Sequence, residues 1–195
     1  MSTYLGIEGV DGAGKSTVCV ELATRLRETG ATVTVVREPG GTATGEAIRS
    51  LLLHGEDMAP WTEALLFAAQ RAQLVAEVVA PALARGEYVI SDRTYYSSLA
   101  YQGGARGLGV EPVREMNEAG LDGVVPDLVV VLWLDPANAL ARQDGLDRIG
   151  GVGTGFQVRV SEVYRRLAAE DPERVRLVDA SRPVSEVVDD IVEML

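Results

Sequence analysis

Short apolar and β-branched runs alternate with longer stretches of helical character along the chain. The run from Tyr4 to Glu8 ends in a glycine-rich turn, and Leu22 and Leu26 follow it at helical spacing. Residues 128–134 are apolar at every position, which suits a strand covered by helices on both faces of a sheet. Three further strands are predicted at residues 33–36, 88–91 and 175–178. This order of elements predicts an α/β fold, a doubly wound five-stranded parallel sheet flanked by helices.

Apolar spacing also predicts two of the helices in more detail. Residues 64–83 are expected to form one long helix that Pro81 kinks or ends. The last helix is expected to start near Pro183 and to bury one apolar face. Its predicted buried residues are Val184, Val187, Val188, Ile191 and Leu195.

One segment lacks the pattern of a core element. Residues 143–155 contain five glycines and charges of both signs, which favours a mobile loop or lid. A chain of 195 residues has the length of one domain. We therefore expect a single domain over residues 1–195, with a short lid at about 143–155.

The charge of the chain limits its partners. A formal net charge of −11 and a pI near 4.6 argue against nonspecific binding to nucleic acid, which needs a positive surface. A small phosphorylated substrate remains compatible if basic residues gather at one site. Seventeen of the 18 basic residues are arginine and only Lys15 is lysine. Position 15 is therefore expected to require a compact ammonium group.

The remaining composition favours a cytoplasmic protein. The sequence has no stretch of signal-peptide form and no apolar run approaching the roughly 20 residues of a membrane helix. We expect no membrane partner. The single cysteine, Cys19, lies among apolar residues of a predicted helix and is expected to be a buried hydrophobe.

A nucleotide-binding motif connects the first strand to the first helix. Residues 9–16 match G-x-x-x-x-G-K-[ST] in the context that this motif requires. Glycines let backbone N–H groups surround phosphate oxygens, the following helix directs its positive end at them, and Lys15 neutralises the transferred group. Ser16 would hold Mg²⁺. The predicted ATP-binding residues are Gly9, Val10, Asp11, Gly12, Ala13, Gly14, Lys15, Ser16 and Thr17.

Two arginines follow neighbouring strands and indicate a second phosphate site. Arg37 comes after the second strand, and Arg93 follows Asp92 after the third, so all three should meet at the carboxyl edge of the sheet. Forked hydrogen bonds from two arginines suit an acceptor phosphate. The alternative is that each arginine pairs with a surface carboxylate. A guanine-specific switch is excluded, since its Asn-Lys-x-Asp run needs a second lysine.

Several segments together resemble the thymidylate kinase family of P-loop nucleoside monophosphate kinases in order and spacing over nearly the whole chain. Together they are far more specific than the nucleotide-binding motif alone. The matching segments are residues 8–17, 37–42, 49–53, 66–73, 92–93 with Ser97, 100–103 and 146–149.

The resemblance implies transfer of the γ-phosphate of ATP to dTMP, giving dTDP and ADP. It implies that Phe67 stacks on the thymine ring, while Arg71 and Ser98 bond its polar edge. Tyr101 is expected against the deoxyribose, and Gln102 is expected to line the same pocket. The predicted substrate-binding residues are Arg37, Phe67, Arg71, Arg93, Ser98, Tyr101 and Gln102. Without the resemblance, Phe67 would be taken for an ordinary core aromatic residue.

The same resemblance implies how the reaction is catalysed. The nucleophile is an oxygen of a phosphate monoester, already anionic at neutral pH, so alignment and charge neutralisation are sufficient. Asp92 is expected to position Mg²⁺ together with Ser16, and Asp11 to lie near the sugar and the transferred phosphate. The predicted catalytic residues are Lys15, Asp11, Asp92, Arg93 and, from the lid, Arg148.

The sequence departs from the family pattern at three places. Thr94 stands where the family usually has an aromatic residue or histidine, Gly150 stands where glutamate is common, and the lid has few arginines. We expect looser packing beneath the sugar and a lower turnover than usual, with thymidylate binding retained. A steady-state kinetic assay tests this expectation, and a normal turnover would contradict it.

The sequence leaves two alternative functions and the oligomeric state undecided. One alternative is a related P-loop kinase acting on another, modified deoxynucleoside monophosphate. The other is a nucleotide-binding regulator without transfer activity. The resemblance also implies a homodimer, for which the apolar helix around Leu65 to Val79 is a candidate interface.

Overall fold

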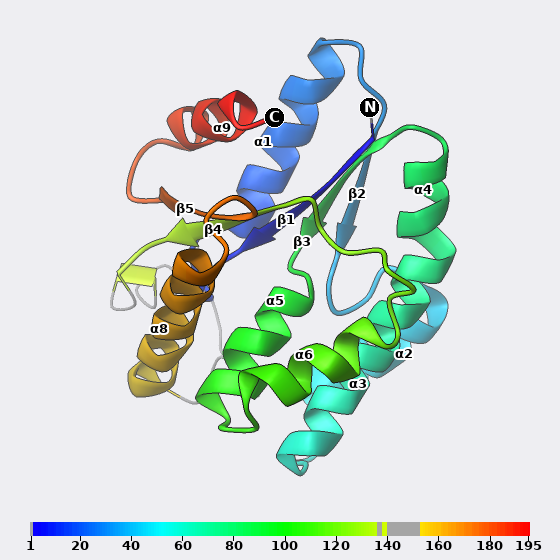
Figure 1. Ribbon diagram of the computed structural model, residues 1–195, viewed down its shortest axis with the longest axis vertical. Helices are drawn as coiled ribbons and strands as arrows, with labels where there is room; N and C mark the ends of the chain where they lie inside the picture. The colour runs from blue at the N-terminus through cyan, green and yellow to red at the C-terminus, as the bar shows by residue number, and fades with distance from the viewer. Residues whose placement is uncertain (1, 136–137, 140–152) are drawn as a thin grey trace.

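The computed structural model describes residues 2–135, 138–139 and 153–195. Five parallel strands form one sheet in the order β2-β3-β1-β4-β5, which confirms the predicted doubly wound fold (Figure 1). The strands are β1 (Thr3–Glu8), β2 (Val33–Arg37), β3 (Tyr88–Asp92), β4 (Leu128–Trp133) and β5 (Val175–Asp179). The single-domain assignment stays a prediction.

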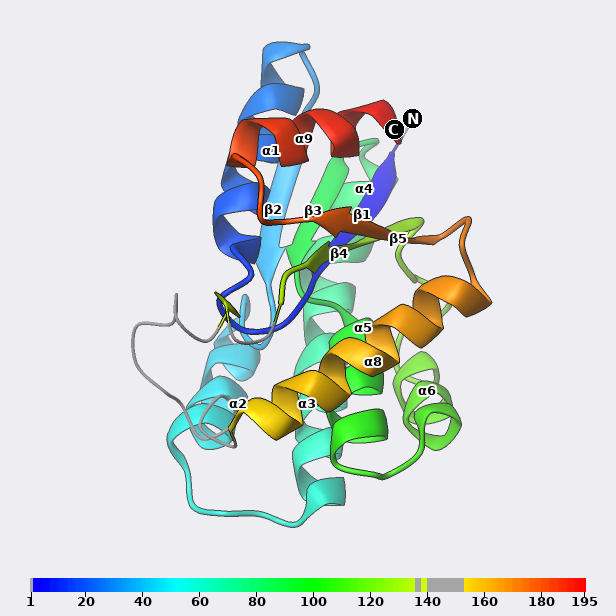
Figure 2. The ribbon, with the colours of Figure 1, turned by 90° about the vertical axis from the view of Figure 1, so that its left-hand side faces the viewer.

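Helices cover both faces of this sheet. Helix α1 packs against α9 on one side, and α8 lies on the other side beside β5 (Figures 1 and 2). The helices are α1 (Lys15–Glu28), α2 (Ala43–His54), α3 (Pro60–Leu74), η1 (Val75–Val79), α4 (Ala80–Ala84), α5 (Tyr95–Ser98), η2 (Leu99–Ala105), α6 (Val110–Glu118), α8 (Thr154–Glu170) and α9 (Val184–Glu193). None within the described ranges is long and apolar enough to span a membrane.

The long helix predicted over residues 64–83 is longer than expected and contains a wider turn. It begins at Pro60, where a proline at the first helical position leaves no donor unpaired. The π-helix η1 follows, with the Ala80 amide donating to the carbonyl oxygen of Val75. This wider turn precedes Pro81, which has no N–H to donate. The helix therefore continues to Ala84 and does not end at the proline.

The core lies between the sheet and its helices. Residues 128–132 of β4 are buried and its last residue, Trp133, is partly exposed. Cys19 on α1 is buried, as predicted. In α9 the predicted face is partly wrong, because Val184 and Leu195 are 37% and 44% exposed. They lie at or beyond the ends of the helix, where fewer neighbours cover them.

The carboxyl ends of three neighbouring strands bring the predicted chemistry together. In register, Arg37 of β2 pairs with Asp92 of β3, and Asp92 pairs with Ile7 of β1. The turn after β1 leads directly to α1 at residue 15. The phosphate motif, the acidic residue and both arginines therefore meet at one edge of the sheet.

Most of the predicted lid lies outside the described residues. Of the described part, Thr154 and Gly155 belong to the first turn of α8, and the lid itself stays a prediction.

Candidate active site

A cavity of about 280 Å³ lies at the carboxyl edge of the sheet. It extends from the turn after β1 to the helices α3, α5 and η2. Its lining residues are Asp11, Lys15, Ser16, Arg37, Glu38, Pro39, Arg49, Leu53, Phe67, Arg71, Asp92, Arg93, Ser97, Ser98, Tyr101 and Gln102. All seven predicted substrate-binding residues are among them.

The turn after β1 has the backbone geometry of a phosphate-binding loop. Gly9, Gly12 and Gly14 have φ values of 136°, 84° and 91°, which favour glycine. A Cβ added to Gly12 would lie 2.0 Å from the carbonyl oxygen of Ala139, so a larger residue does not fit. Within the described chain, no side chain caps the first turn of α1. Its backbone N–H groups are left for phosphate oxygens.

Lys15 is held by the same loop. Its Nζ donates to the carbonyl oxygens of Gly9 and Val10 at 3.2 and 2.9 Å, and the residue is only 8% exposed. Burial, together with the nearby Arg93 charge, lowers the pKa of Lys15 to about 8. A buried ammonium beside the loop is placed to neutralise phosphate oxygens.

Ser16 and Asp92 form a pair of oxygen groups at the start of α1 and the end of β3. The Ser16 hydroxyl donates to Asp92 Oδ2 at 2.5 Å. No cluster of three or more acidic, histidine or cysteine side chains suited to a metal occurs within the described ranges. Magnesium commonly binds one or two protein oxygens together with substrate phosphates, and this pair fits such a site.

Arg93 lines the cavity and has a constrained backbone conformation. Its φ of 74° is unusual for a residue with a side chain. The guanidinium pairs with Asp11, donates to Ser97 Oγ at 3.1 Å and lies 5.1 Å from the Tyr101 ring centroid. Although burial opposes ionisation, Arg93 and Lys15 hold the pKa of the Asp11 carboxyl below its usual value. Both charges are therefore present at neutral pH.

Arg37 is placed differently, since it is half exposed. Its Nη2 lies 3.1 Å from Glu46 Oε1, and the two side chains are 54% and 46% exposed. The alternative of pairing with a surface carboxylate is therefore met for Arg37, whose partner is Glu46, but not for Arg93, whose partner Asp11 lines the cavity. An exposed pair of this kind is weak, so a bound phosphate can replace Glu46 as the partner of Arg37.

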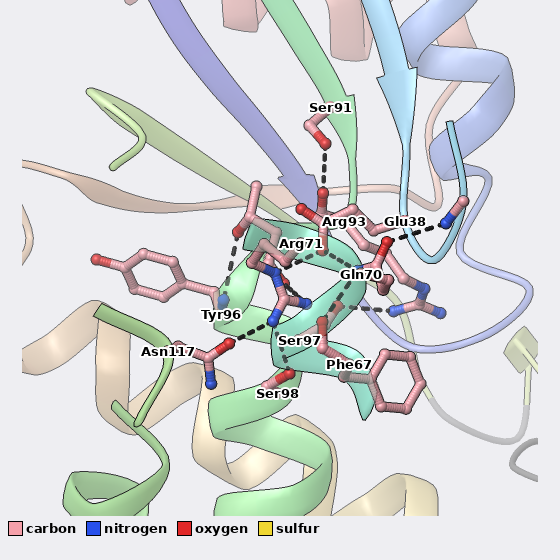
Figure 3. Close-up of polar contacts among 12 residues, drawn as sticks. Glu38, Phe67, Gln70, Arg71, Ser91, Arg93, Tyr96, Ser97, Ser98 and Asn117 are labelled. Carbon is pink, nitrogen blue, oxygen red and sulfur yellow. Dashed lines mark hydrogen bonds and ion pairs between the residues drawn. The ribbon is translucent and has the colours of Figure 1, made fainter. Parts of the chain in front are cut away.

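Arg71 is almost fully buried at the far end of the cavity. Its Nε donates to Glu38 Oε2 at 2.5 Å, and its Nη1 donates to Ser98 Oγ at 3.2 Å (Figure 3). The same Nη1 donates to Asn117 Oδ1. Burial raises the pKa of the Glu38 carboxyl, although Arg71 and Gln70 favour its ionised form. Arg71 and Ser98 are thus together as predicted, while Glu38 and Asn117 were not predicted.

Comparison with known proteins agrees with this geometry. The family model described as thymidylate kinase matches residues 7–191. The chain belongs to the thymidylate kinase family. A thymidylate kinase of Bifidobacterium longum (strain DJO10A) is 47% identical over 190 residues, covering 94% of this chain and 92% of the relative. One of Geobacillus thermodenitrificans is 44% identical over 196 residues, covering 97% and 87%. One of Caldanaerobacter subterraneus subsp. tengcongensis is 44% identical over 184 residues, covering 93% and 88%.

Residues assigned from the family resemblance surround the central part of the cavity. Phe67 lines it from α3 and is partly buried against the core. Tyr101 is buried and meets Phe156 edge-on at 5.9 Å between ring centroids. Gln102 donates to Glu63 Oε1 at 2.9 Å, so its side chain is already oriented from the α3 side.

The expectation of looser packing around Thr94 is wrong. Thr94 is fully buried and does not line the cavity. Its hydroxyl donates to Glu8 Oε1 at 2.8 Å, and its methyl group lies against Gly6 of β1. Arg93 has a positive φ, and the side chain of the residue after it faces Gly6 of the sheet and not the cavity.

Some predicted residues lie outside the described part of the chain, and others were missed. Arg148 and Gly150 are not described, so their roles stay predictions. Glu8 was missed, although a carboxylate at the end of an apolar strand was a signal of buried partners. Its Oε2 accepts from Ser97 Oγ at 2.6 Å and from the Tyr164 hydroxyl at 2.7 Å. Glu8 thereby supports the serine that contacts Arg93.

Proposed function

We propose that this member of the thymidylate kinase family transfers the γ-phosphate of ATP to dTMP, giving ADP and dTDP. One observation carries this proposal. A single cavity joins a phosphate-binding loop containing Lys15 and Ser16 to a wall formed by Phe67, Arg71 and Ser98. A donor nucleotide at the first end and a pyrimidine nucleotide at the second bring their phosphates together near Arg93.

In the proposed mechanism the protein aligns two phosphates and neutralises charge. The attacking oxygen of dTMP is already anionic, so no general base is required. Arg93 and Arg37 would hold the acceptor phosphate in line with the γ-phosphate, and Lys15 would stabilise the charge on the transferred group. Ser16 and Asp92 would hold Mg²⁺, which neutralises phosphate oxygens when bound. Arg148 is proposed to add positive charge from the lid.

Phe67 is proposed to stack on the thymine ring, with Arg71 and Ser98 bonding its polar edge. Tyr101 and Gln102 would enclose the deoxyribose, and Asp11 would lie close to it. The support for these roles is that all of these side chains line one cavity.

An acceptor panel tests the function directly. Purified protein with ATP and Mg²⁺ is assayed for ADP formation with dTMP, dUMP, UMP, dCMP, dGMP, AMP and thymidine, and again with a chelator. We expect turnover with dTMP, weaker turnover with dUMP and none without the metal. Preference for another monophosphate would favour the related-kinase alternative. ATP binding without any turnover would favour a regulator.

ATP binding is expected to take up a proton at alkaline pH. Since the pKa of Lys15 is lowered to about 8, most of the free protein carries a neutral amine at about pH 9. Phosphate oxygens favour the ammonium form and raise that pKa on binding. Calorimetry in two buffers of different ionisation enthalpy should show uptake approaching one proton per ATP at about pH 9 and little at neutral pH. Equal uptake by a Lys15→Met variant would assign the proton to another group.

A homodimer is proposed from apolar residues on the surface of the chain. Leu51 of α2 is 54% exposed, and Trp61 and Leu65 of α3 are 43% and 54% exposed. They belong to two helices that pack against each other. Light scattering should give twice the 20.8 kDa chain mass, and Leu65→Arg should reduce it to one chain. A monomeric wild type would contradict the proposal.

The cytoplasmic location expected from the sequence stays a proposal, which cell fractionation followed by the dTMP assay would test.

A further inference from the structure

The buried guanidinium of Arg71 has almost all of its hydrogen-bonding capacity used within the protein. Arginine carries five N–H donors. Nε bonds Glu38, both N–H groups of Nη1 bond Ser98 and Asn117, and one N–H of Nη2 bonds the Thr94 carbonyl oxygen. One N–H, on Nη2, is left without an acceptor among the described residues. Arg71 is 2% exposed and lines the cavity.

Asn117 differs from the other side chains that bond Arg71. Glu38 and Ser98 line the cavity, whereas Asn117 does not and is 2% exposed. It comes from α6, which packs against α3. In Figure 3 its side chain lies on one side of the Arg71 guanidinium and Phe67 lies on the other. Asn117 therefore acts on a ligand only through Arg71.

The orientation of Asn117 is itself fixed. Its Nδ2 donates to the Val113 carbonyl oxygen one turn earlier on α6, at 2.7 Å. This bond directs Oδ1 toward Arg71, because a flipped amide would place its NH2 group against the guanidinium and its oxygen against the Val113 carbonyl oxygen. The helix thus presents an acceptor, and only an acceptor, to Nη1.

We propose that Asn117 is a positioning residue that makes Arg71 selective for a pyrimidine with an oxo group at position 4. The inference rests on the proposed function, in which Arg71 bonds the edge of the base. With its other donors occupied, Arg71 offers a single N–H in a fixed direction. An oxo group accepts that hydrogen bond, whereas an amino group at the same position presents N–H to N–H and leaves buried donors unpaired.

Loss of Asn117 frees a second buried N–H on Nη1. That donor then competes for the nearest acceptor, and the guanidinium rotates away from the direction that suits the base. The expected result is a rise of about tenfold in the KM for dTMP. The KM for ATP is expected to stay within about twofold, because the Asn117 side chain bonds Arg71 and Val113 and does not line the cavity that the phosphate-binding loop borders.

Kinetics of the full-length protein test the proposal with three variants. Asn117→Leu removes the acceptor at similar volume, and Asn117→Asp keeps an oxygen facing Arg71. Val113→Ala is the matched control, since it weakens packing of the same helix without touching Arg71. For each variant, kcat and KM are measured with dTMP and with 5-methyl-dCMP, which carries an amino group in place of the 4-oxo group and lacks the N3 proton of dTMP. The KM for ATP and the thermal midpoint complete the set.

We expect Asn117→Leu to raise the KM for dTMP about tenfold and to reduce the preference for dTMP over 5-methyl-dCMP by a similar factor. Asn117→Asp should retain dTMP binding within about threefold, and Val113→Ala should lose stability with the preference unchanged. An unchanged preference in Asn117→Leu, or an equal change in Val113→Ala, would overturn the proposal. Should Asn117→Leu fail to fold, Asn117→Ala is measured in its place, and we expect the same rise in the KM for dTMP and the same reduced preference. A wild type inactive with dTMP would overturn the proposed function first, and this inference with it.

Discussion

Replacing Lys15 by arginine is expected to leave the fold intact and to lower kcat for phosphoryl transfer by at least about 100-fold. Lys15 is held at 2.9 Å from the Val10 carbonyl oxygen and buried against the turn that surrounds the phosphates. A guanidinium keeps the charge but is planar and broader, so it cannot occupy this position as a compact point charge. The substitution should slow phosphoryl transfer more than it weakens ATP binding, because Lys15 neutralises charge most strongly in the transition state.

Single-turnover kinetics with ATP and dTMP measure this effect, and circular dichroism checks the fold. Arg25→Lys is the matched control because it exchanges the same two residue types at a 38% exposed side chain paired with Asp189. It should leave kcat unchanged. A Lys15→Arg variant that turns over at a near-normal rate would show that the loop does not act as a phosphate cradle.

The largest effect on stability is expected from Arg71→Met, with a loss of about 3–5 kcal/mol in the free energy of unfolding. The substitution removes the partner of the buried Glu38 carboxylate and leaves the acceptors of Ser98 and Asn117 unpaired. Urea unfolding measures the change. Arg37→Met is the control for stability, since the Arg37 ion pair is half exposed and should contribute less than about 1 kcal/mol.

The loss in Arg71→Met should also depend on pH with a defined sign. The pKa of the Glu38 carboxyl is already raised by burial, and removal of Arg71 raises it further. A folded-state pKa above the unfolded value means that the folded protein binds more protons, so stability falls as pH rises between the two values. The variant should therefore be less impaired at about pH 5 than at neutral pH. Glu38→Gln in the same chain should abolish this dependence, and a persistent dependence would implicate another carboxyl.

Local patterns predicted the sheet and the phosphate-binding loop well. The strands are short runs rich in apolar and β-branched residues and the loop motif is contiguous, so both can be recognised without knowledge of contacts from distant parts of the chain. The carboxyl edge also follows from topology alone, because parallel strands place their ends together. Arg37, Asp92 and Arg93 were brought to one edge for this reason.

Buried polar partners were not predictable in the same way. Asn117 is 46 residues from Arg71, and Glu38 is 33 residues from it. Nothing local in the sequence distinguishes these residues from solvated surface positions. The prediction of looser packing at Thr94 was wrong for a different reason. The direction of the Thr94 side chain depends on the positive φ of Arg93, the residue before it. A sequence pattern carries little information on that angle for a residue other than glycine.

The cavity wall formed by the π-helix η2 depends on the number of residues in this segment as much as on which residues they are. Tyr101 and Gln102 are adjacent residues that both line the cavity from this wider turn. Loss of one residue between Leu99 and Ala105 would let the helix return to α spacing and rotate one part against the other by about 100°. A substitution at Tyr101 or Gln102 changes one side chain of this wall, whereas loss of one residue shifts both. Insertions and deletions should therefore be rarer in this segment than substitutions, even though it lies in a helix and not in the phosphate-binding loop.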